Sequence, residues 1–336
     1  MPNPPQKLFL LDAMALIYRA HFAFSKNPRI NSKGLNTSAV LGFANSLLEV
    51  INKEKPTHIA VAFDTAAPTF RHEIYKEYKA GRQETPEDIV TAIPYVKKFI
   101  EAFNIPILEK DRYEADDIIG TFAKKAAEAD LQVYMMSTDK DFCQLVSDNI
   151  YLYKPAYMGN GVDILDKKKV LEKWEIRSID QVIDILGLQG DKVDNIPGIP
   201  GVGEKTAKKL IEEFGSVENL IENAGQLEGK LKEKVVEFAE QGLLSKQLAT
   251  IDTGVPLDFD VEKLLYKGPD NDALIALLDE LEFRTIKKRL FGEFPSPSGD
   301  TSRSNRGEGL GVRSKSASSD QMSLFEAPPT PPPPGG

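Results

Sequence analysis

The chain has 336 residues, 41% of them hydrophobic and 28% charged, with a formal net charge of −9. These values are ordinary for a globular protein of two domains, and no apolar run is long enough to cross a bilayer, so we expect no membrane partner. Cys143 is the single cysteine, which excludes intrachain disulfides and thiolate zinc sites and favours a cytoplasmic location.

Four short apolar runs in the first half of the chain are predicted to be buried strands: residues 8–11, 58–63, 133–136 and 150–153. Residues 40–51 and 116–128 have the apolar spacing of amphipathic helices. Strands that alternate with helices predict a mostly parallel central sheet flanked by helices. We therefore expect an α/β domain at residues 1–165.

The character of the sequence changes after about Asp166. From there to about Phe291 helical periods dominate, lysines are frequent and strand-like runs nearly vanish, which predicts a smaller helical domain at residues 166–293. Residues 294–336 are rich in Ser, Gly, Pro and Arg. Such a segment buries too little apolar surface to offset its chain entropy, so we expect a disordered tail.

Three of the predicted strands run into aspartate, at Asp12, Asp64 and Asp139. In an open parallel sheet, ligands gather outside the carboxyl ends of the strands, so these acids are expected to converge. Six further acids stand in short clusters: Glu114, Asp116, Asp117, Asp141, Asp191 and Asp194. Each acid taken alone is better explained as a helix cap or a turn residue.

The nine acids together need a different explanation, because so many converging carboxylates would repel one another unless cations neutralised them. Oxygen ligands without His or Cys select Mg²⁺ or Mn²⁺, and His21, His58 and His72 lack ligand-like spacing. Two such ions about 3.5–4 Å apart suit phosphodiester hydrolysis. Setting the nine acids aside leaves −9 + 9 = 0, so the net charge does not exclude nucleic acid as a partner.

Five stretches of the sequence together resemble one family: LFLLDAMALIYRAHFAF, AVAFDTAAPTFRHEIYKEYKAGR, YEADDIIGTFA, MMSTDKDFCQLV and GLQGDKVDNIPGIPGVGEKTAKKLI. This is the 5′-nuclease family, which includes the N-terminal domain of bacterial DNA polymerase I, the phage 5′-exonucleases and the flap endonucleases. The resemblance extends from about Lys7 to Phe294. It implies a PIN/5′-nuclease-like α/β fold followed by a helical domain.

The resemblance implies that two Mg²⁺ ions, for which Mn²⁺ would substitute, are held by all nine acids: Asp12, Asp64, Glu114, Asp116, Asp117, Asp139, Asp141, Asp191 and Asp194. The first ion would be surrounded by Asp12, Asp64, Glu114 and Asp116. The second would lie nearer Asp116, Asp139, Asp141 and Asp194. Every one of these positions is acidic here, so the resemblance indicates an active enzyme.

Basic and aromatic residues alternate in the segment 70–82, where Arg71, Tyr75, Tyr78, Lys79 and Arg82 are predicted to lie close to one helical stripe. This pattern suits single-stranded nucleic acid, although a solvated amphipathic helix explains it as well. The resemblance implies a helical arch near residues 66–105. In it, Lys79 and Arg82 would polarise the scissile phosphate, and Tyr78 would stack on an unpaired base. Asp116 is the third residue to which the resemblance gives a catalytic role.

Further DNA contacts are expected from Arg19, Arg71 and the segment 196–211, which reads IPGIPGVGEKTAKKLI. Its glycines allow a tight turn, and the helix that follows would present free N–H groups to a phosphate. The segment looks like a helix–hairpin–helix near residues 185–220; the alternative is a hairpin used only for packing. The contact residues there would be Gly198, Gly201, Gly203, Lys205, Thr206 and Lys208. The family often holds a monovalent cation at this hairpin, which implies K⁺.

The tail contains one apolar cluster, at residues 321–325, in which Gln321 is followed by Leu324 and Phe325. This pentapeptide resembles the bacterial sliding-clamp motif, in which a Leu-Phe pair fills an apolar groove. The alternative is a chance sequence in a linker.

We therefore expect a monomeric 5′-3′ exonuclease and flap endonuclease of the bacterial nucleoid. It would act on DNA 5′ ends, flaps, nicks and RNA–DNA primers, in primer removal from Okazaki fragments and in DNA repair, as the front part of a DNA polymerase I. Two alternatives remain open. One is a ribonuclease of the related acidic-site fold, and the other is a non-catalytic DNA-binding adaptor.

Overall fold

The computed structural model describes residues 6–155 and 161–292. Its centre is a six-stranded sheet with the order β3-β2-β1-β4-β5-β6, formed within the described residues. The first five strands are parallel and β6 is antiparallel to β5. The strands are β1 (Lys7–Asp12), β2 (His58–Ala62), β3 (Ile107–Leu108), β4 (Gln132–Met136), β5 (Ile150–Lys154) and β6 (Asp163–Leu165). The mostly parallel sheet was predicted, and the two short edge strands β3 and β6 were not.

The register of the sheet aligns the strand ends that carry acids. Asp12 pairs with Ala62 across β1 and β2, and Leu11 pairs with Met136 across β1 and β4. Asp64 therefore follows its strand by two residues and Asp139 by three, on the same edge of the sheet as Asp12. Because parallel strands place all their carboxyl ends at one edge, the topology brings these acids together.

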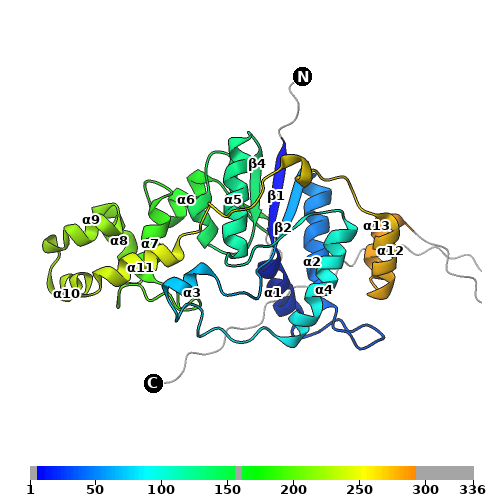
Figure 1. Ribbon diagram of the computed structural model, residues 1–336, viewed down its shortest axis with the longest axis horizontal. Helices are drawn as coiled ribbons and strands as arrows, with labels where there is room; N and C mark the ends of the chain where they lie inside the picture. Colours follow the sequence, from blue (N-terminus) through cyan, green and yellow to red (C-terminus); the bar gives the residue numbers. More distant parts are fainter. Residues whose placement is uncertain (1–5, 156–160, 293–336) are drawn as a thin grey trace, which may run out of the picture.

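Helices cover both faces of the sheet, as the alternating side chains of β1 require. Leu8 and Leu10 face a cluster that contains α5, whereas Phe9 and Leu11 face a second cluster that contains α1, α2 and α4. These helices are α1 (Ala13–Phe24), α2 (Ser38–Glu49), α4 (Glu87–Ala102) and α5 (Ala115–Glu128). Figure 1 shows α5 on one side of the strands and α2 with α4 on the other.

A group of helices extends from one end of the sheet (Figure 1). It comprises α6 (Lys167–Trp174), α7 (Gln181–Gln189), α8 (Glu204–Phe214), α9 (Val217–Glu222), α10 (Gly229–Glu237) and α11 (Ala239–Ala249). Their buried residues, among them Ile185, Leu210 and Val217, belong to the same apolar cluster as α5. The α/β part and the helical part thus share one continuous core, which fixes the position of the hairpin between α7 and α8 relative to the sheet.

The last two helices lie away from this group. In α12 (Asn271–Glu280) and α13 (Arg284–Phe291), buried Leu274, Leu278 and Ile286 pack into the cluster of α2 and α4. Figure 1 shows the two helices at the opposite end of the molecule from α8–α10. Both helices fall within the helical domain expected at residues 166–293, whose boundaries stay a prediction. After α11 the chain returns along α5, where Val255 N–H donates to Thr121 Oγ1 at 3.1 Å.

The remaining short elements are α3 (Phe70–Ile74), a π-helical turn at Val50–Glu54, and 3₁₀ turns at Asp141–Leu145, Ala224–Gln226 and Val261–Leu264. Within the described ranges, no helix combines the length and the hydrophobicity that a membrane-spanning helix needs. The expected tail at 294–336, including Gln321, Leu324 and Phe325, lies outside the described residues.

Candidate active site

One cavity of about 250 Å³ at the carboxyl edge of the sheet collects most of the predicted acids. Its lining includes seven of the nine carboxylates: Asp12, Asp64, Glu114, Asp116, Asp139, Asp141 and Asp194. They arrive from the ends of β1 and β2, the first turn of α5, the loop after β4 and the loop between α7 and α8. Residues separated by up to 182 positions, 194 − 12, thus face one space.

Local hydrogen bonds fix the orientation of the acids at the strand ends. Asp12 is the N-cap of α1, with its Oδ1 accepting from Ala15 N–H at 3.0 Å and its Oδ2 accepting from Ser137 Oγ at 2.8 Å. Asp64 Oδ1 accepts from Ala115 N–H at 2.9 Å, which joins the end of β2 to the start of α5. Ser137 was not predicted from the sequence as a residue of the site. Its position between β4 and Asp139, at the carboxyl end of a strand, is the sequence feature that could have indicated it.

Burial and mutual repulsion raise the pKa values of several of these carboxyls. Burial raises the pKa of Asp12 to about 6, with hydrogen bonds from Ala15 and Ser137 opposing the shift and the charges of Asp64 and Asp139 adding to it. Burial, followed by the charge of Asp139, raises the pKa of Asp141 to about 8. The pKa of Asp116 is raised well above its usual value by burial and then by the charge of Asp12. The acids are thus held together at an electrostatic cost.

The donor set fits a hard divalent cation. Every acid in the cavity offers carboxylate oxygens, which Mg²⁺ and Mn²⁺ prefer. Asp141 Oδ1 is buried and has no hydrogen-bond partner among the described residues, so this atom calls for a cation rather than a protein donor. In the described part of the chain, no three such side chains are already close enough to enclose an ion. The ligands would therefore have to turn inward when an ion binds.

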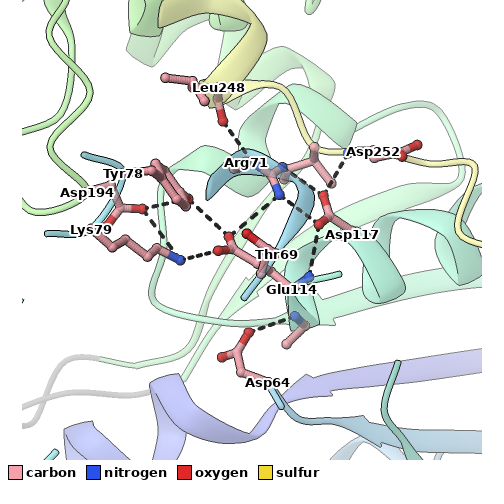
Figure 2. A network of polar contacts seen from close by, with 12 residues as sticks. Asp64, Thr69, Arg71, Tyr78, Lys79, Glu114, Asp117, Asp194, Leu248 and Asp252 are labelled. Carbon is pink, nitrogen blue, oxygen red and sulfur yellow. Dashed lines mark hydrogen bonds and ion pairs between the residues drawn. The ribbon is translucent and has the colours of Figure 1, made fainter. Parts of the chain in front are cut away.

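Arg71 and Asp117 form a buried ion pair beside the acids of the cavity. Both carboxylate oxygens of Asp117 accept from Arg71, each at 2.8 Å, and they also accept from the N–H groups of Glu114 at 3.0 Å and Asp252 at 2.8 Å. Asp117 is 0% and Arg71 3% exposed. Each residue thus uses its charge on the other inside the protein (Figure 2), and Arg71 also lines the cavity. That Asp117 binds metal and that Arg71 binds DNA stay predictions.

Arg71 also joins three parts of the molecule. It lies on α3, pairs with Asp117 on α5, and donates to the carbonyl oxygens of Leu248 at 2.9 Å and Thr250 at 2.8 Å near the end of α11. The guanidinium can satisfy all these acceptors because it presents a planar fork of N–H donors. The pair therefore holds the first turn of α5, with Glu114 and Asp116, against the helical part.

The segment after α3 does not continue as a helix, contrary to the predicted stripe of residues 70–82. The helix ends at Ile74, and Lys79 has a left-handed backbone with φ +58°, which costs a lysine about 1 kcal/mol. Lys79 Nζ nevertheless reaches Glu114 Oε1 at 2.5 Å, and Arg82 Nη2 reaches Asp194 Oδ1 at 2.5 Å. Both cations line the cavity with the acids.

Tyr78 is a buried residue of the cavity lining. The residue is 3% exposed, and its hydroxyl lies 3.1 Å from Glu114 Oε2 and 3.3 Å from Asp194 Oδ2, so that these two carboxylates share its single proton (Figure 2). Burial and the charges of these two acids raise the pKa of the Tyr78 hydroxyl, so it stays a donor. The structure thus gives Tyr78 a hydrogen-bonding role among the acids, and its stacking on an unpaired base stays a prediction.

The range 66–105, where an arch was expected, contains α3, a non-helical segment and α4. In α4, Ile89, Val96, Phe99 and Ile100 are buried against α2 and the sheet. The part that borders the cavity is the non-helical segment between α3 and α4 that carries Lys79 and Arg82.

Asp191 is a turn residue outside the cavity lining. Its Oδ1 accepts from Val193 N–H at 2.7 Å and from Asp194 N–H at 3.4 Å, and its charge adds to the raised pKa of Asp141. Arg19 is also outside the lining and half-buried on α1, where its Nη1 donates to Ser46 Oγ at 3.4 Å. Neither of these two predicted residues therefore lines the cavity.

The predicted helix–hairpin–helix is present as α7, a glycine-rich turn and α8. Gly198 has φ +59°, its N–H donates to Ser245 Oγ at 2.9 Å, and its carbonyl accepts from Gln241 at 2.7 Å. Gly198 therefore shapes the turn, with its N–H and carbonyl bonded inside the protein, and its contact with DNA stays a prediction. Gly201, with φ +84°, is exposed at the tip.

The start of α8 remains open for an anion. Gly203 is its N-cap and supplies no side-chain acceptor, so the first N–H groups of the helix keep their hydrogen-bonding capacity. Lys205 is exposed there, and Thr206 N–H donates to Gly203 O at 2.9 Å. Lys208 is already paired, with its Nζ 3.0 Å from Glu175 and 3.2 Å from Glu204.

Comparisons with known proteins agree with this architecture. The profile of the 5′-3′ exonuclease N-terminal resolvase-like domain matches residues 7–175, and that of the 5′-3′ exonuclease C-terminal SAM fold matches residues 178–272. The chain is 45% identical over 287 residues to DNA polymerase I of Bacillus subtilis, covering 85% of this chain and 32% of that protein. It is 41% identical over 286 residues to DNA polymerase I of Geobacillus stearothermophilus, covering 84% and 32%. The chain thus spans about a third of the length of these relatives.

Two solved structures share the fold. The phage T5 5′-exonuclease with bound divalent zinc matches with a TM-score of 0.61 and 21% identity, covering 83% of this chain and 99% of that one. The catalytic core of Rad2 in complex with a DNA substrate matches with a TM-score of 0.56 and 20% identity, covering 82% and 88%. At these identities the likeness concerns the fold.

Proposed function

Because the chain belongs to the 5′-3′ exonuclease family and is a nuclease, we propose that it hydrolyses DNA phosphodiesters at 5′ ends and 5′ flaps with the help of two divalent metal ions. The observation that carries the proposal is one cavity in which seven carboxylates meet three cationic side chains, Arg71, Lys79 and Arg82. Carboxylates suit metal binding, and the cations suit a phosphate.

The residues divide into two roles in this proposal. The carboxylates of Asp12, Asp64, Glu114 and Asp116 would hold one ion, and those of Asp139, Asp141 and Asp194 would hold the second. The ions would be Mg²⁺ in the cell, with Mn²⁺ as a substitute. When bound, such ions lower the pKa of water and neutralise the attacking and leaving oxygens. Lys79 and Arg82 leave their carboxylate partners and neutralise the scissile phosphate, which orients it for attack.

DNA would be held on the duplex side by the start of α8. The open N–H groups there and the exposed Lys205 contact backbone phosphates, which positions a duplex without reading its sequence. We also propose K⁺ at this hairpin. The DNA-bound fold relative supports a DNA substrate, and the 5′-end preference rests on the family.

The test is product sizing on a 5′-labelled flap DNA with Mg²⁺, together with an Asp116→Asn variant. Wild-type protein should release 5′ fragments, and the variant should lose cleavage while binding the flap in Ca²⁺ as tightly as wild type. Wild-type protein that binds flaps without cutting them in Mg²⁺ or Mn²⁺ would support the adaptor alternative. Faster cleavage of single-stranded RNA than of the flap would support the ribonuclease.

The wider biological role is part of the same proposal. Because the DNA polymerase I relatives are about three times longer than the matched part, we propose that this chain acts as the front part of such a polymerase, in the nucleoid. It would remove RNA–DNA primers from Okazaki fragments and act in DNA repair as a monomer. A nick-translation assay on the whole polypeptide, with Asp116→Asn as the matched control, tests this role: both proteins should extend the primer, and only the wild type should degrade the strand ahead.

The clamp motif adds a partner to the proposal. Gln321, Leu324 and Phe325 lie outside the described residues, and their support is the sequence pattern alone. On immobilised bacterial sliding clamp, wild-type chain should be retained and Phe325→Ala should pass through. Equal retention of the two forms removes the clamp from the proposal.

A further inference from the structure

The loop of residues 190–198 follows α7 and precedes the glycine-rich turn before α8, and it is closed by backbone hydrogen bonds. Asp191 and Ile196 exchange two backbone hydrogen bonds, at 2.9 and 2.7 Å. At its base Gly190 and Gly198 are in backbone contact, since a Cβ on Gly198 would lie 2.5 Å from Gly190 N. Gly198 is also bonded to Ser245 on α11. The base of the 190–198 loop is therefore anchored in the helical part of the protein.

The tip of the same loop contacts the segment that contains Lys79 and Arg82, which line the cavity. Lys79 N–H donates to the carbonyl of Asp194 at 2.9 Å. The side-chain amide of Asn195 donates to the carbonyl of Glu77 at 2.6 Å. Arg82 is bound by the carboxylate of Asp194. Residues 77–82 thus rest on the loop tip through both main-chain and side-chain bonds.

Two left-handed residues meet at this junction, Asn195 with φ +55° and Lys79 with φ +58°. Asparagine adopts this conformation readily, whereas lysine does so only when its surroundings impose it. Asn195 is bonded to Glu77, which precedes Lys79 in the chain. Asp194 is bonded to the N–H of Lys79 itself and to the side chain of Arg82, which follows it. They supply the constraint that keeps its backbone in place and its ammonium 2.5 Å from Glu114 Oε1.

We infer that Asn195 is a positioning residue, which holds the 77–79 backbone so that Lys79 points into the acidic cavity. The inference rests on the proposed function, in which Lys79 acts on the scissile phosphate. The 190–198 loop leads directly into the glycine-rich turn before α8, which is proposed to bind duplex DNA. The same loop therefore connects the proposed duplex-binding site to the residues that orient Lys79. No feature of the sequence around Asn195 distinguishes it from an ordinary turn asparagine.

The test removes the amide donor in two different ways. Asn195→Gly keeps a residue that tolerates positive φ, and Asn195→Asp keeps the shape of the side chain; neither can donate to Glu77. Asn104 supplies a matched control, because it has φ +53° and its amide donates to the carbonyl of Gly268 at 2.9 Å, away from the cavity. The measured quantities are the single-turnover cleavage rate of flap DNA in Mg²⁺, the flap Kd in Ca²⁺ and the unfolding temperature.

Both Asn195 variants should cleave about tenfold more slowly, because small misplacement of a catalytic group lowers the rate steeply. Their flap Kd and unfolding temperature should match those of Asn104→Gly and Asn104→Asp, which cleave at the wild-type rate. Wild-type rates in the Asn195 variants would overturn the inference, as would a loss that only follows a lower unfolding temperature. If the wild type and the Asn104 variants never cut the flap, the proposed function fails and the inference falls with it.

A double-mutant cycle separates the route through Lys79 from an effect on Asp194. In a Lys79→Ala background, Asn195→Gly should reduce the residual cleavage rate no further, because the group that it positions is gone. The half-saturating Mg²⁺ concentration should also stay at its Lys79→Ala value. A further tenfold loss, or a raised Mg²⁺ requirement, would show that Asn195 acts through the acid next to it and would overturn the inference.

Discussion

Arg71 and Asp117 face each other in the interior with two parallel contacts, Nη1 to Oδ2 and Nη2 to Oδ1, each 2.8 Å long. This ion pair gives Asp117 different surroundings from Asp116, the preceding residue on α5, which lines the cavity. Successive residues of a helix point about 100° apart. One acid of the pair therefore faces the cavity and the other faces the guanidinium.

Asp117→Asn should destabilise the protein without removing a metal ligand. The substitution leaves Arg71 buried without a counter-charge, so the free energy of unfolding should fall by about 3–5 kcal/mol in urea denaturation. The exposed Asp111→Asn serves as the control for loss of one negative charge. An Asp117→Asn protein of wild-type stability that has lost Mg²⁺ binding in calorimetry would restore Asp117 as a ligand.

The stability of the metal-free protein should depend on pH through Asp141. Its pKa is 3.8 without perturbation and about 8 in the fold, so the folded state holds a proton that the unfolded state releases. This contribution to stability is complete below about pH 4 and is lost as the pH rises through 8. Asp141→Asn removes the carboxyl and should flatten the fall in unfolding temperature between pH 5 and 8, measured in EDTA, because this pH range lies within the window from 3.8 to about 8.

Magnesium should reverse this trend, because it binds the deprotonated carboxylate. The rise in unfolding temperature on adding Mg²⁺ should therefore grow with pH in the wild type and grow less in Asp141→Asn. Subtracting the two proteins cancels the titration of groups that they share. Identical pH profiles for both would exclude Asp141 as the source of the dependence.

Lys79→Ala should lower cleavage far more than flap binding. Loss of one preorganised positive group beside the phosphate is expected to reduce the single-turnover rate about 10²–10³-fold, with the flap Kd in Ca²⁺ nearly unchanged. Lys76→Ala, an exposed lysine of the same segment, is the control. A loss confined to the Kd would assign Lys79 to substrate binding instead.

Tyr78→Phe should affect stability and leave flap binding intact. The hydroxyl bonds to Glu114 and Asp194 disappear, at a cost of about 1–2 kcal/mol in the free energy of unfolding. The aromatic ring remains, so a stacking role would predict no change in Tyr78→Phe and a large loss in Tyr78→Leu. Equal flap Kd values for Phe and Leu at this position would support the structural role of the buried ring.

Lys205 and Lys208 should differ in the salt dependence of DNA binding. A lysine that contacts phosphate contributes about −0.9 to the slope of log K against log salt concentration. Lys205→Ala should lower the steepness by about that amount, whereas Lys208→Ala should change it little because Glu175 and Glu204 already neutralise Lys208. Equal changes for both would show that DNA displaces those two acids.

The sequence by itself determined the local features of this protein. Apolar runs located β1, β2, β4 and β5, because a parallel strand buried on both faces must be continuously hydrophobic. The acids that follow those strands were found for the same reason, since parallel topology sends their ends to one edge. The glycine-rich turn before α8 and the motifs shared with the 5′-nuclease family were equally readable along the chain.

Only the tertiary structure decided which charges meet. Asp116 and Asp117 are adjacent in sequence and have opposite surroundings, and Arg71 could not be assigned to Asp117 until the fold placed α3 beside α5. Tyr78 and Asn195 depend in the same way on partners 36 and 118 residues away. Periodicity specifies which face of an element is buried. The partner of a polar side chain is set by the packing of elements distant in the chain, which no local pattern contains.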